Sequence, residues 1–348
     1  MSKSSKMLAE IHEQPGVLQA MLDQCATEVE AAARLIKDRR PAFLVMDARG
    51  TSYNAALYGK YLFEAFAGLP VCFTAPSLTT LYGAKVDYSR AVMIGVSQSG
   101  ASEDLLAAME SAKATGAGTI ALCNTAGSAL TKLADVKLIT PAGKEQAVAA
   151  TKSFISQLMG LALIAAEVSG SKKLKNALAK VPALVAGALS LEAQVLEQSQ
   201  RYTATTTCAM LGRGYNLATA YEAALKLTEC AYIAAQGFSL AIFEHGPKAL
   251  ATDGFPLFVY AAKGAAYKQA GEAIAAYKQQ GAEVTVIANC QRLARKGAFG
   301  LRVPGEFDEA VSPIVFTPVG QLFAYGIATA KGYQPDAPRL LNKVTSTR

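Results

Sequence analysis

Two acids and an amine recur on one predicted helix in the second half of the chain. Glu222, Lys226 and Glu229 are four and three residues apart, so a helix places all three side chains on one face. The positions around them are apolar, which favours burial, and a buried carboxylate must be paired. Groups placed in this way can move protons and offset charge that develops in a reaction. A salt-bridged surface stripe explains the same spacing, and the helix alone does not separate the two interpretations.

One of only two histidines follows this helix. His245 lies in the turn Glu244-His-Gly-Pro247, and an imidazole titrates near neutral pH, so it can pass a proton in either direction. A buried structural histidine is the alternative. We expect a site role for His245 and a structural role for His12.

Hydroxyl and amide side chains gather after a predicted strand in the first half of the chain. They are Ser97, Gln98, Ser99 and Ser102. Amides at the start of a helix carry partial positive charge and serine hydroxyls add donors, so this turn suits a phosphate monoester. Helix capping is the alternative, although three hydroxyls and an amide exceed what a cap needs. Thr51 and Ser52 follow another strand and could join the cradle, and capping explains them equally well.

Strands and helices alternate through most of the sequence. Apolar strands are predicted at 42–47, 71–75, 91–96, 119–124 and 136–140, and a long helix from about 147 to 168. The first 40 residues are predicted to be helical, with a break at Pro15. Continuous apolar strands alternating with helices indicate a parallel sheet covered on both faces, and ligands bind at the carboxyl ends of such strands.

The second half of the chain repeats the first. Residues 46–50 match 210–214 and residues 92–96 fall on 256–260, an offset of 164, while 121–124 match 286–289, an offset of 165. These matches predict an internal duplication. The serine cluster survives only in the first copy and the Glu/Lys helix occurs only in the second, so we expect one composite site. The expected boundaries are a helical segment 1–38, a first domain 39–170, a helical linker 171–200, a second domain 201–332 and a tail 333–348.

Composition excludes several classes of protein. Half of the 348 residues are hydrophobic (51%) and 18% are charged, which is typical of a globular protein rather than a disordered one. Two histidines and six scattered cysteines without a C-x-x-C pair disfavour a metal site and indicate a reduced, cytoplasmic protein. The start of the chain lacks a signal peptide, and the apolar runs near 158–166 and 181–191 are too short to span a membrane.

The net charge of +7 suits a small anionic substrate. Basic residues are spread along the chain without an aromatic-rich stripe, so we expect no nucleic-acid partner. Gly212-Arg-Gly214 lacks the third glycine of a dinucleotide fingerprint, since Leu217 stands in its place, and no P-loop is present. We therefore expect no nicotinamide, no ATP and no other cofactor.

Five motifs in order resemble the sugar isomerase (SIS) family. They are AEIHEQP, RGTSY, VSQSG, AYEAALKLTE and EHGP, and they are most similar to the isomerase half of glucosamine-6-phosphate synthases. The resemblance covers almost the whole chain. It implies an α/β fold of two duplicated flavodoxin-like, doubly wound parallel sheet domains, with an N-terminal helical segment and a C-terminal tail.

The resemblance also implies roles for individual residues. Ser97, Gln98, Ser99, Ser102 and Ser52 match the family's phosphate loop, and Glu229 matches its proton-shuttling base, with Glu222 and Lys226 beside it. His245 matches a ring-opening histidine that reaches in from a partner subunit, which implies a homodimer. Lys343 is the candidate Schiff-base lysine, although Asn342 replaces the small residue that usually precedes it. Val148 and Ala150 match a sugar-contacting segment, where Ala150 replaces the usual serine.

The expected reaction follows from the absence of a glutaminase portion at the start of this sequence. Stand-alone proteins of this pattern are similar to the second type of glucosamine-6-phosphate deaminase, which forms fructose 6-phosphate and ammonia. Deamination of galactosamine 6-phosphate, or deglycation of a fructosamine 6-phosphate, is an alternative. A non-catalytic sugar-phosphate sensor is another, although no helix-turn-helix extension is visible.

Overall fold

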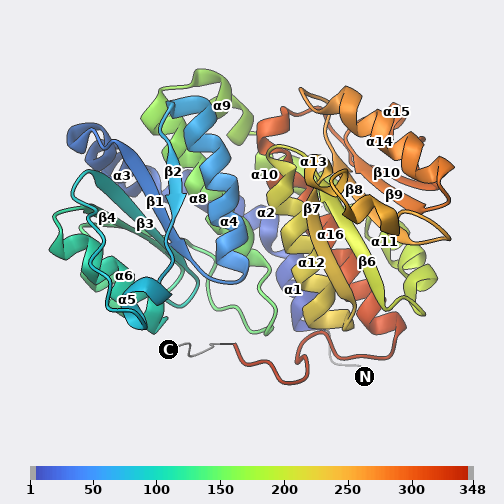
Figure 1. The fold of residues 1–348 in the computed structure, drawn as a ribbon, viewed down its shortest axis with the longest axis horizontal. Coiled ribbons are helices and arrows are strands. Elements are labelled where there is room, and N and C mark those ends of the chain that lie inside the picture. Colours follow the sequence, from blue (N-terminus) through green and yellow to red (C-terminus); the bar gives the residue numbers. More distant parts are fainter. Residues whose placement is uncertain (1–4, 344–348) are drawn as a thin grey trace. The chain divides into compact units, whose positions relative to one another are not determined.

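The computed structural model describes residues 5–343 of the chain, which divide into two compact units. The first unit comprises residues 16–145 and 152–179 together with Asn342 and Lys343. The second unit comprises residues 5–15, 146–151 and 180–341. Each unit contains one parallel sheet covered by helices (Figure 1).

The first unit is built on a five-stranded parallel sheet. Its strands are β1 (Phe43–Ala48), β2 (Val71–Phe73), β3 (Ala91–Ser97), β4 (Gly118–Cys123) and β5 (Val136–Ile139), in the order β2-β1-β3-β4-β5. Strands β3 and β4 are buried at every position, which explains why they are continuous apolar runs. Helices α3 (Ala26–Arg39), α4 (Thr51–Leu62) and α8 (Lys152–Ser169) pack together over one face, and α6 (Glu103–Ala114) and α7 (Ala129–Leu133) cover the other (Figure 1).

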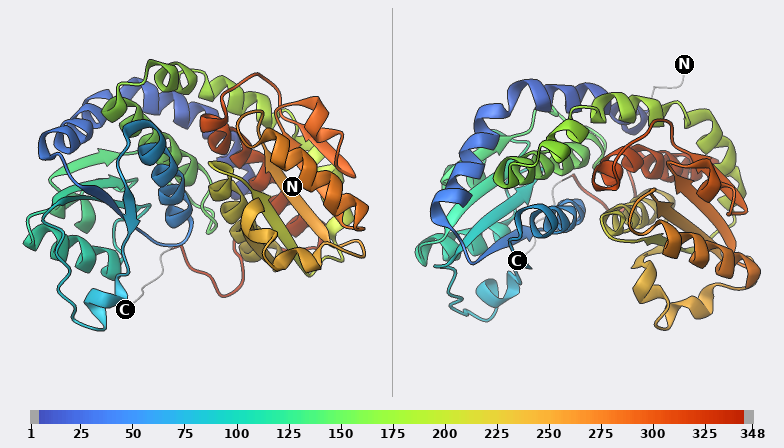
Figure 2. Two further views of the ribbon diagram at one scale, coloured as in Figure 1. Left: turned by 45° about the horizontal axis from the view of Figure 1, so that its top comes forward. Right: turned by 90° about the horizontal axis from the view of Figure 1, so that it is seen from above.

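The second unit repeats this plan. Its strands are β6 (Thr207–Gly212), β7 (Ala234–Ser239), β8 (Pro256–Ala261), β9 (Glu283–Ala288) and β10 (Phe299–Arg302), in the order β10-β9-β8-β6-β7. Read from β7, this order matches that of the first sheet strand for strand, which confirms the predicted duplication. Helices α12 (Asn216–Ala231) and α16 (Ser312–Ala330) pack on one face with α10 (Val181–Leu189) and α11 (Glu192–Ser199) (Figure 2). Helices α14 (Tyr267–Gln279) and α15 (Gln291–Ala294) pack against the strands on the other face.

Short elements complete the two units. They are α1 (Lys6–His12), α2 (Gln14–Gln24), α5 (Ser77–Thr80), α9 (Lys172–Leu178), α13 (Leu240–Phe243), the π-helix η1 (Phe63–Ala67) and the 3₁₀-helices η2 (Gln200–Tyr202), η3 (Pro247–Leu250) and η4 (Glu309–Val311). Pro15 lies in the first turn of α2 and does not break the helix. Proline lacks a backbone N–H, and the N–H groups of a first turn have no acceptor within the helix, so no hydrogen bond is lost. The predicted break falls instead at Glu13, between α1 and α2.

The long helix predicted from 147 begins later, at Lys152. Residues 146–151 belong to the second unit. There the carboxylate of Glu10 accepts hydrogen bonds from the backbone N–H groups of Gln146 and Ala147. These amides are therefore committed to a distant side chain rather than to a helix, and the prediction of the helix start was wrong.

Helix α16 is apolar enough and long enough to cross a membrane. The span Glu309–Ala330 has 22 residues, but 94% of its most apolar window is buried inside the protein. Its apolar side chains pack with α12, α10 and α11, so a core helix explains them. Among the described residues the six cysteines are free thiols, and four of them are buried.

Candidate active site

The serine loop leaves the carboxyl end of β3 in the first unit. Ser97 is 8% exposed, and its hydroxyl accepts a hydrogen bond from the N–H of Gly100 at 2.9 Å. Gly100 has φ +63°, and a Cβ there would lie 2.3 Å from the Ser128 hydroxyl, so only glycine fits this tight turn. Ser102 occupies the N-cap position of α6 but its side chain caps no amide. Capping therefore does not account for Ser102, and its hydroxyl remains available to a ligand.

The turn after β1 belongs to the same edge of the same sheet. Thr51 opens α4, and the Ser52 hydroxyl accepts a hydrogen bond at 3.0 Å from the Gln157 amide on α8. Strands β1 and β3 are neighbours in parallel register, from Phe43 opposite Ala91 to Ala48 opposite Val96. Both turns therefore follow adjacent strands at one end of the sheet, where open α/β sheets bind ligands.

A buried carboxyl group lies beneath this edge. Asp47 is fully buried near the end of β1 and accepts a hydrogen bond from the Thr74 hydroxyl at 2.7 Å. Burial raises its pKa to about 7, against the opposing effects of Thr74 and Arg49, and the nearby charge of Asp104 raises it further. Arg49 is itself paired with Asp104 at 3.1 Å. Near neutral pH, Asp47 is thus partly protonated, and the charge of Asp104 is offset by Arg49.

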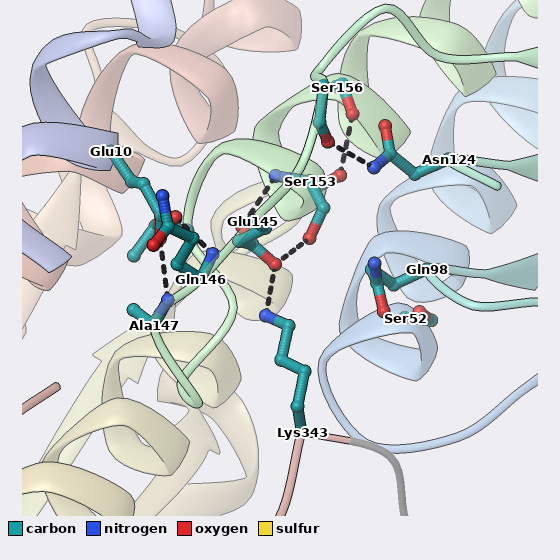
Figure 3. Close-up of polar contacts among 12 residues, drawn as sticks. Glu10, Ser52, Gln98, Asn124, Glu145, Gln146, Ala147, Ser153, Ser156 and Lys343 are labelled. Carbon is teal, nitrogen blue, oxygen red and sulfur yellow. Dashed lines mark hydrogen bonds and ion pairs between the residues drawn. The ribbon is translucent and has the colours of Figure 1, made fainter. Parts of the chain in front are cut away.

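Lys343 is brought to a buried glutamate of its own unit. Its Nζ lies 2.6 Å from Oε2 of Glu145, whose side chain is fully buried. Ser153 at the start of α8 holds the same carboxylate with its N–H at 3.0 Å and its hydroxyl at 2.7 Å (Figure 3). Although burial opposes it, the charge of Lys343 and these hydrogen bonds keep the pKa of Glu145 below its usual value. The tail lysine is therefore held by a fixed carboxylate rather than exposed.

The segment that carries Val148 and Ala150 belongs to the second unit. The N–H of Val148 donates to the backbone oxygen of Asp336 at 3.4 Å, and both residues are partly exposed. The neighbouring Ala147 and Ala149 are buried in the core of that unit. Residues 147–149 form a bend rather than part of a helix.

Helix α12 brings the two acids and the amine together as its spacing predicts. Lys226 is 1% exposed and contacts Glu222 at 3.5 Å, and it also donates to Glu229. Burial alone would lower the pKa of Lys226, but the two carboxylates outweigh it and hold this pKa above its usual value. Glu222 is buried, whereas the side chain of Glu229 is 23% exposed. Glu229 is thus the member of the trio that a ligand can reach.

The two histidines lie in different settings. His245 is exposed, between α13 and η3, and the following Gly246 has φ +130°. Its neighbour Glu244 is engaged with Lys248 at 3.0 Å and with the Tyr277 hydroxyl. His245 is therefore not a buried structural histidine. His12 on α1 instead pairs with Glu192 on α11 at 2.7 Å.

Sequence reasoning missed two residues of this arrangement. Glu145 precedes the Val148 segment by three residues, and no local pattern indicates that a lysine 198 residues away will pair with it. Gln157 had a usable signal, because it is a polar residue four positions after Ser153 on the apolar helix α8. No group of three or more potential metal ligands occurs among residues 5–343.

Comparisons with known proteins identify the family of the chain. Residues 38–166 match the family model described as the SIS domain. An isomerizing glutamine–fructose-6-phosphate aminotransferase from Thermococcus kodakarensis is 36% identical over 347 residues, which cover 97% of this chain and 57% of that protein. The chain therefore spans little more than half the length of the curated relatives that it matches.

Solved structures share the fold over almost the whole chain. A protein from Silicibacter pomeroyi, provisionally assigned as a phosphosugar isomerase, has 31% identity and a TM-score of 0.87, covering 95% of this chain and 100% of that one. Glucosamine-6-phosphate deaminase from Thermotoga maritima has 22% identity and a TM-score of 0.78, covering 99% and 100%. The second likeness is one of fold alone.

Proposed function

The chain belongs to the SIS domain family, and from this premise we propose that it catalyses an aldose–ketose isomerisation of a hexose 6-phosphate. The proposed substrate is glucosamine 6-phosphate, which reacts with water to give fructose 6-phosphate and ammonia. The observation that carries the amine chemistry is the placement of the Lys343 amine at 2.6 Å from the buried Glu145 carboxylate. No cofactor is part of this proposal.

The phosphate is assigned to the serine loop. Ser99, Ser102 and the amides at the start of α6 supply hydrogen-bond donors, and Ser52 adds another from the adjacent turn. Binding energy gained at this non-reacting group positions the distant carbons 1 and 2. Backbone groups at Val148 and Ala150 are assigned to the sugar hydroxyls.

Proton transfer is assigned to His245 and Glu229. His245 moves a proton from the anomeric hydroxyl to the ring oxygen, which opens the sugar. Glu229 takes the proton from carbon 2 and returns it to carbon 1. The oxygen at carbon 1 gains the proton that the nitrogen loses, so the aldehyde becomes an alcohol and the amine at carbon 2 becomes an imine. Lys226, with Glu222 behind it, offsets the negative charge of the enolate between these steps.

Lys343 is assigned to the release of ammonia. Glu145 accepts a proton from the ammonium group, and the free amine attacks carbon 2 of the imine. Ammonia leaves, and water then hydrolyses the lysine imine to give fructose 6-phosphate and the original amine. Glu145 is a positioning residue in this scheme, because it acts on the substrate only through Lys343.

An ammonia-release assay tests the activity. Purified protein should release one ammonia for each fructose 6-phosphate formed from glucosamine 6-phosphate. Galactosamine 6-phosphate and a fructosamine 6-phosphate, assayed in parallel, test the two alternative substrates. A folded protein that releases ammonia from none of the three contradicts the proposal.

Borohydride trapping tests the role of Lys343. Reduction in the presence of fructose 6-phosphate should attach the sugar to the peptide that carries Lys343, as detected by mass spectrometry. Lys343→Met should abolish the adduct. Lys331→Met is the matched control, because Lys331 binds the carbonyl of Thr205 and has no assigned role, and it should retain the adduct. An adduct of equal yield in Lys343→Met would remove Lys343 from the mechanism.

We further propose a homodimer in which His245 serves the site of the partner. This proposal is supported by the exposure of His245 in the single chain. Glu229→Gln and His245→Ala should each be inactive alone. Mixed under conditions of subunit exchange, they should regain activity, because some sites then contain both native residues. No recovery between variants shown by mass to form mixed dimers would contradict a shared site.

A further inference from the structure

A polar cavity lies at the edge of the second sheet, outside the residues assigned above. Its volume is about 250 Å³. It is lined by Lys263, Asn289, Cys290, Gln291, Arg302, Glu306 and Phe307. Lys263 follows β8, residues 289–291 follow β9 and Arg302 ends β10, so the cavity occupies the carboxyl end of the sheet. That is the end at which the first unit carries its serine loop, and at which open α/β sheets bind ligands.

Basic side chains outnumber acidic ones in the lining of this cavity. Lys263 and Arg302 form no ion pair with any residue in 5–343, and Glu306 is the one acidic side chain in the lining. The cavity therefore carries net positive charge. Its size admits a small anion such as a phosphate group with a short substituent, rather than a nucleotide.

The loop next to the cavity already binds an anionic group of the protein itself. It corresponds to the serine loop, with Lys263 and Gly264 in the place of Ser99 and Gly100. The N–H of Ala265 donates to the carboxylate of Glu309 at 2.9 Å, and a Cβ on Gly264 would lie 2.0 Å from that carboxylate. The Glu309 carboxylate thus occupies the space beside Gly264 and Ala265 in the second loop. The cavity lined by Lys263 and Arg302 is not filled by this side chain.

We infer that this cavity is a second anion site, which binds a small phosphate ester through Lys263 and Arg302. The amide of Asn289 joins two other lining residues, with its Oδ1 accepting from the N–H of Lys263 at 2.8 Å and its Nδ2 donating to the carbonyl of Phe307 at 3.3 Å. This side chain ties the two ends of the cavity together. The inference is independent of the proposed activity, because it uses none of the residues assigned to the reaction.

Cys290 is a built-in reporter for the site. It is a partly buried free thiol in the cavity lining, and the exposed Cys72 on β2 of the first unit is an internal control. Alkylation by iodoacetamide, followed by peptide mass spectrometry, measures both rates in one sample. Inorganic phosphate and glycerol 3-phosphate are the probes, and sodium chloride at matched ionic strength corrects for screening.

The expected result is selective protection. At about ten times the dissociation constant of the probe, labelling of Cys290 should slow about tenfold while that of Cys72 is unchanged. The paired variant Lys263→Met/Arg302→Met should lose the protection and keep the far-ultraviolet circular dichroism of the native protein. Gln279→Met, a change on the same unit away from the cavity, should retain it. Unprotected Cys290, or protection that survives in Lys263→Met/Arg302→Met, overturns the inference.

Discussion

Replacement of Lys226 by methionine tests whether the charged trio on α12 is a buried, coupled unit. Lys226 is 1% exposed and lies 3.5 Å from Glu222, whose side chain is 4% exposed. At an effective dielectric constant of about 20, two charges at this separation attract by roughly 5 kcal/mol. Desolvation offsets part of this attraction in the native protein, but Lys226→Met removes the Lys226 cation from beside the buried Glu222 carboxylate. The expected loss of stability is about 3–5 kcal/mol.

The measurement is urea denaturation followed by circular dichroism, with Lys60→Met as the matched control. Lys60 and Glu64 form a pair with the same four-residue spacing, but their side chains are 32% and 40% exposed. Such surface pairs contribute about 0.3–0.5 kcal/mol, so Lys60→Met should change stability little. The deficit of Lys226→Met should shrink in acid, where protonation neutralises the buried carboxylate of Glu222. A loss below about 1 kcal/mol, equal to that of the control, would refute the reasoning.

Three further changes test the first unit. Asp47→Asn should stabilise the protein at pH 8 but not at pH 4: the pKa of Asp47 is raised from 3.8 to about 7, so native stability falls as pH rises between these values, by up to about 4 kcal/mol. Equal stabilisation at both pH values, measured by urea titration, would contradict this sign. Gly100→Ala should weaken sugar-phosphate binding at least about tenfold in calorimetry, because its Cβ collides with Ser128, whereas Gly68→Ala, with φ +64° but open space, should not. Glu145→Gln should lower kcat by about 10²-fold with little change in KM, because the Lys343 amine loses its proton acceptor. A kcat within about twofold of native would leave Glu145 without this role.

The strands and the duplication could be predicted from the sequence because parallel strands are buried on both faces. Each apolar run, such as 92–96, is continuous, and a matching run occurs one domain later at 256–260. The face shared by Glu222, Lys226 and Glu229 was also predictable, since helical spacing alone determines it. These are local properties of the chain.

The rest depends on partners far apart in the sequence. The segment 146–151 has helix-compatible composition, yet Glu10 binds its first amides and the segment stays outside α8. The pair of Glu145 and Lys343 joins positions 198 residues apart, so no window of sequence contains both. Glu309 fills the second loop for the same reason, from 44 residues beyond Ala265. Such contacts become visible only when the packed chain is known.

The most direct test of the account is turnover and binding of glucosamine 6-phosphate by Glu229→Gln. In the proposed mechanism Glu229 transfers the proton, and the serine loop binds the phosphate. Ammonia release should therefore fall by about 10²–10⁴-fold, while the dissociation constant measured by calorimetry stays within about threefold of the native value. Turnover that survives the substitution, or binding that is lost with it, would contradict the assignment of phosphate binding to the serine loop and of proton transfer to α12.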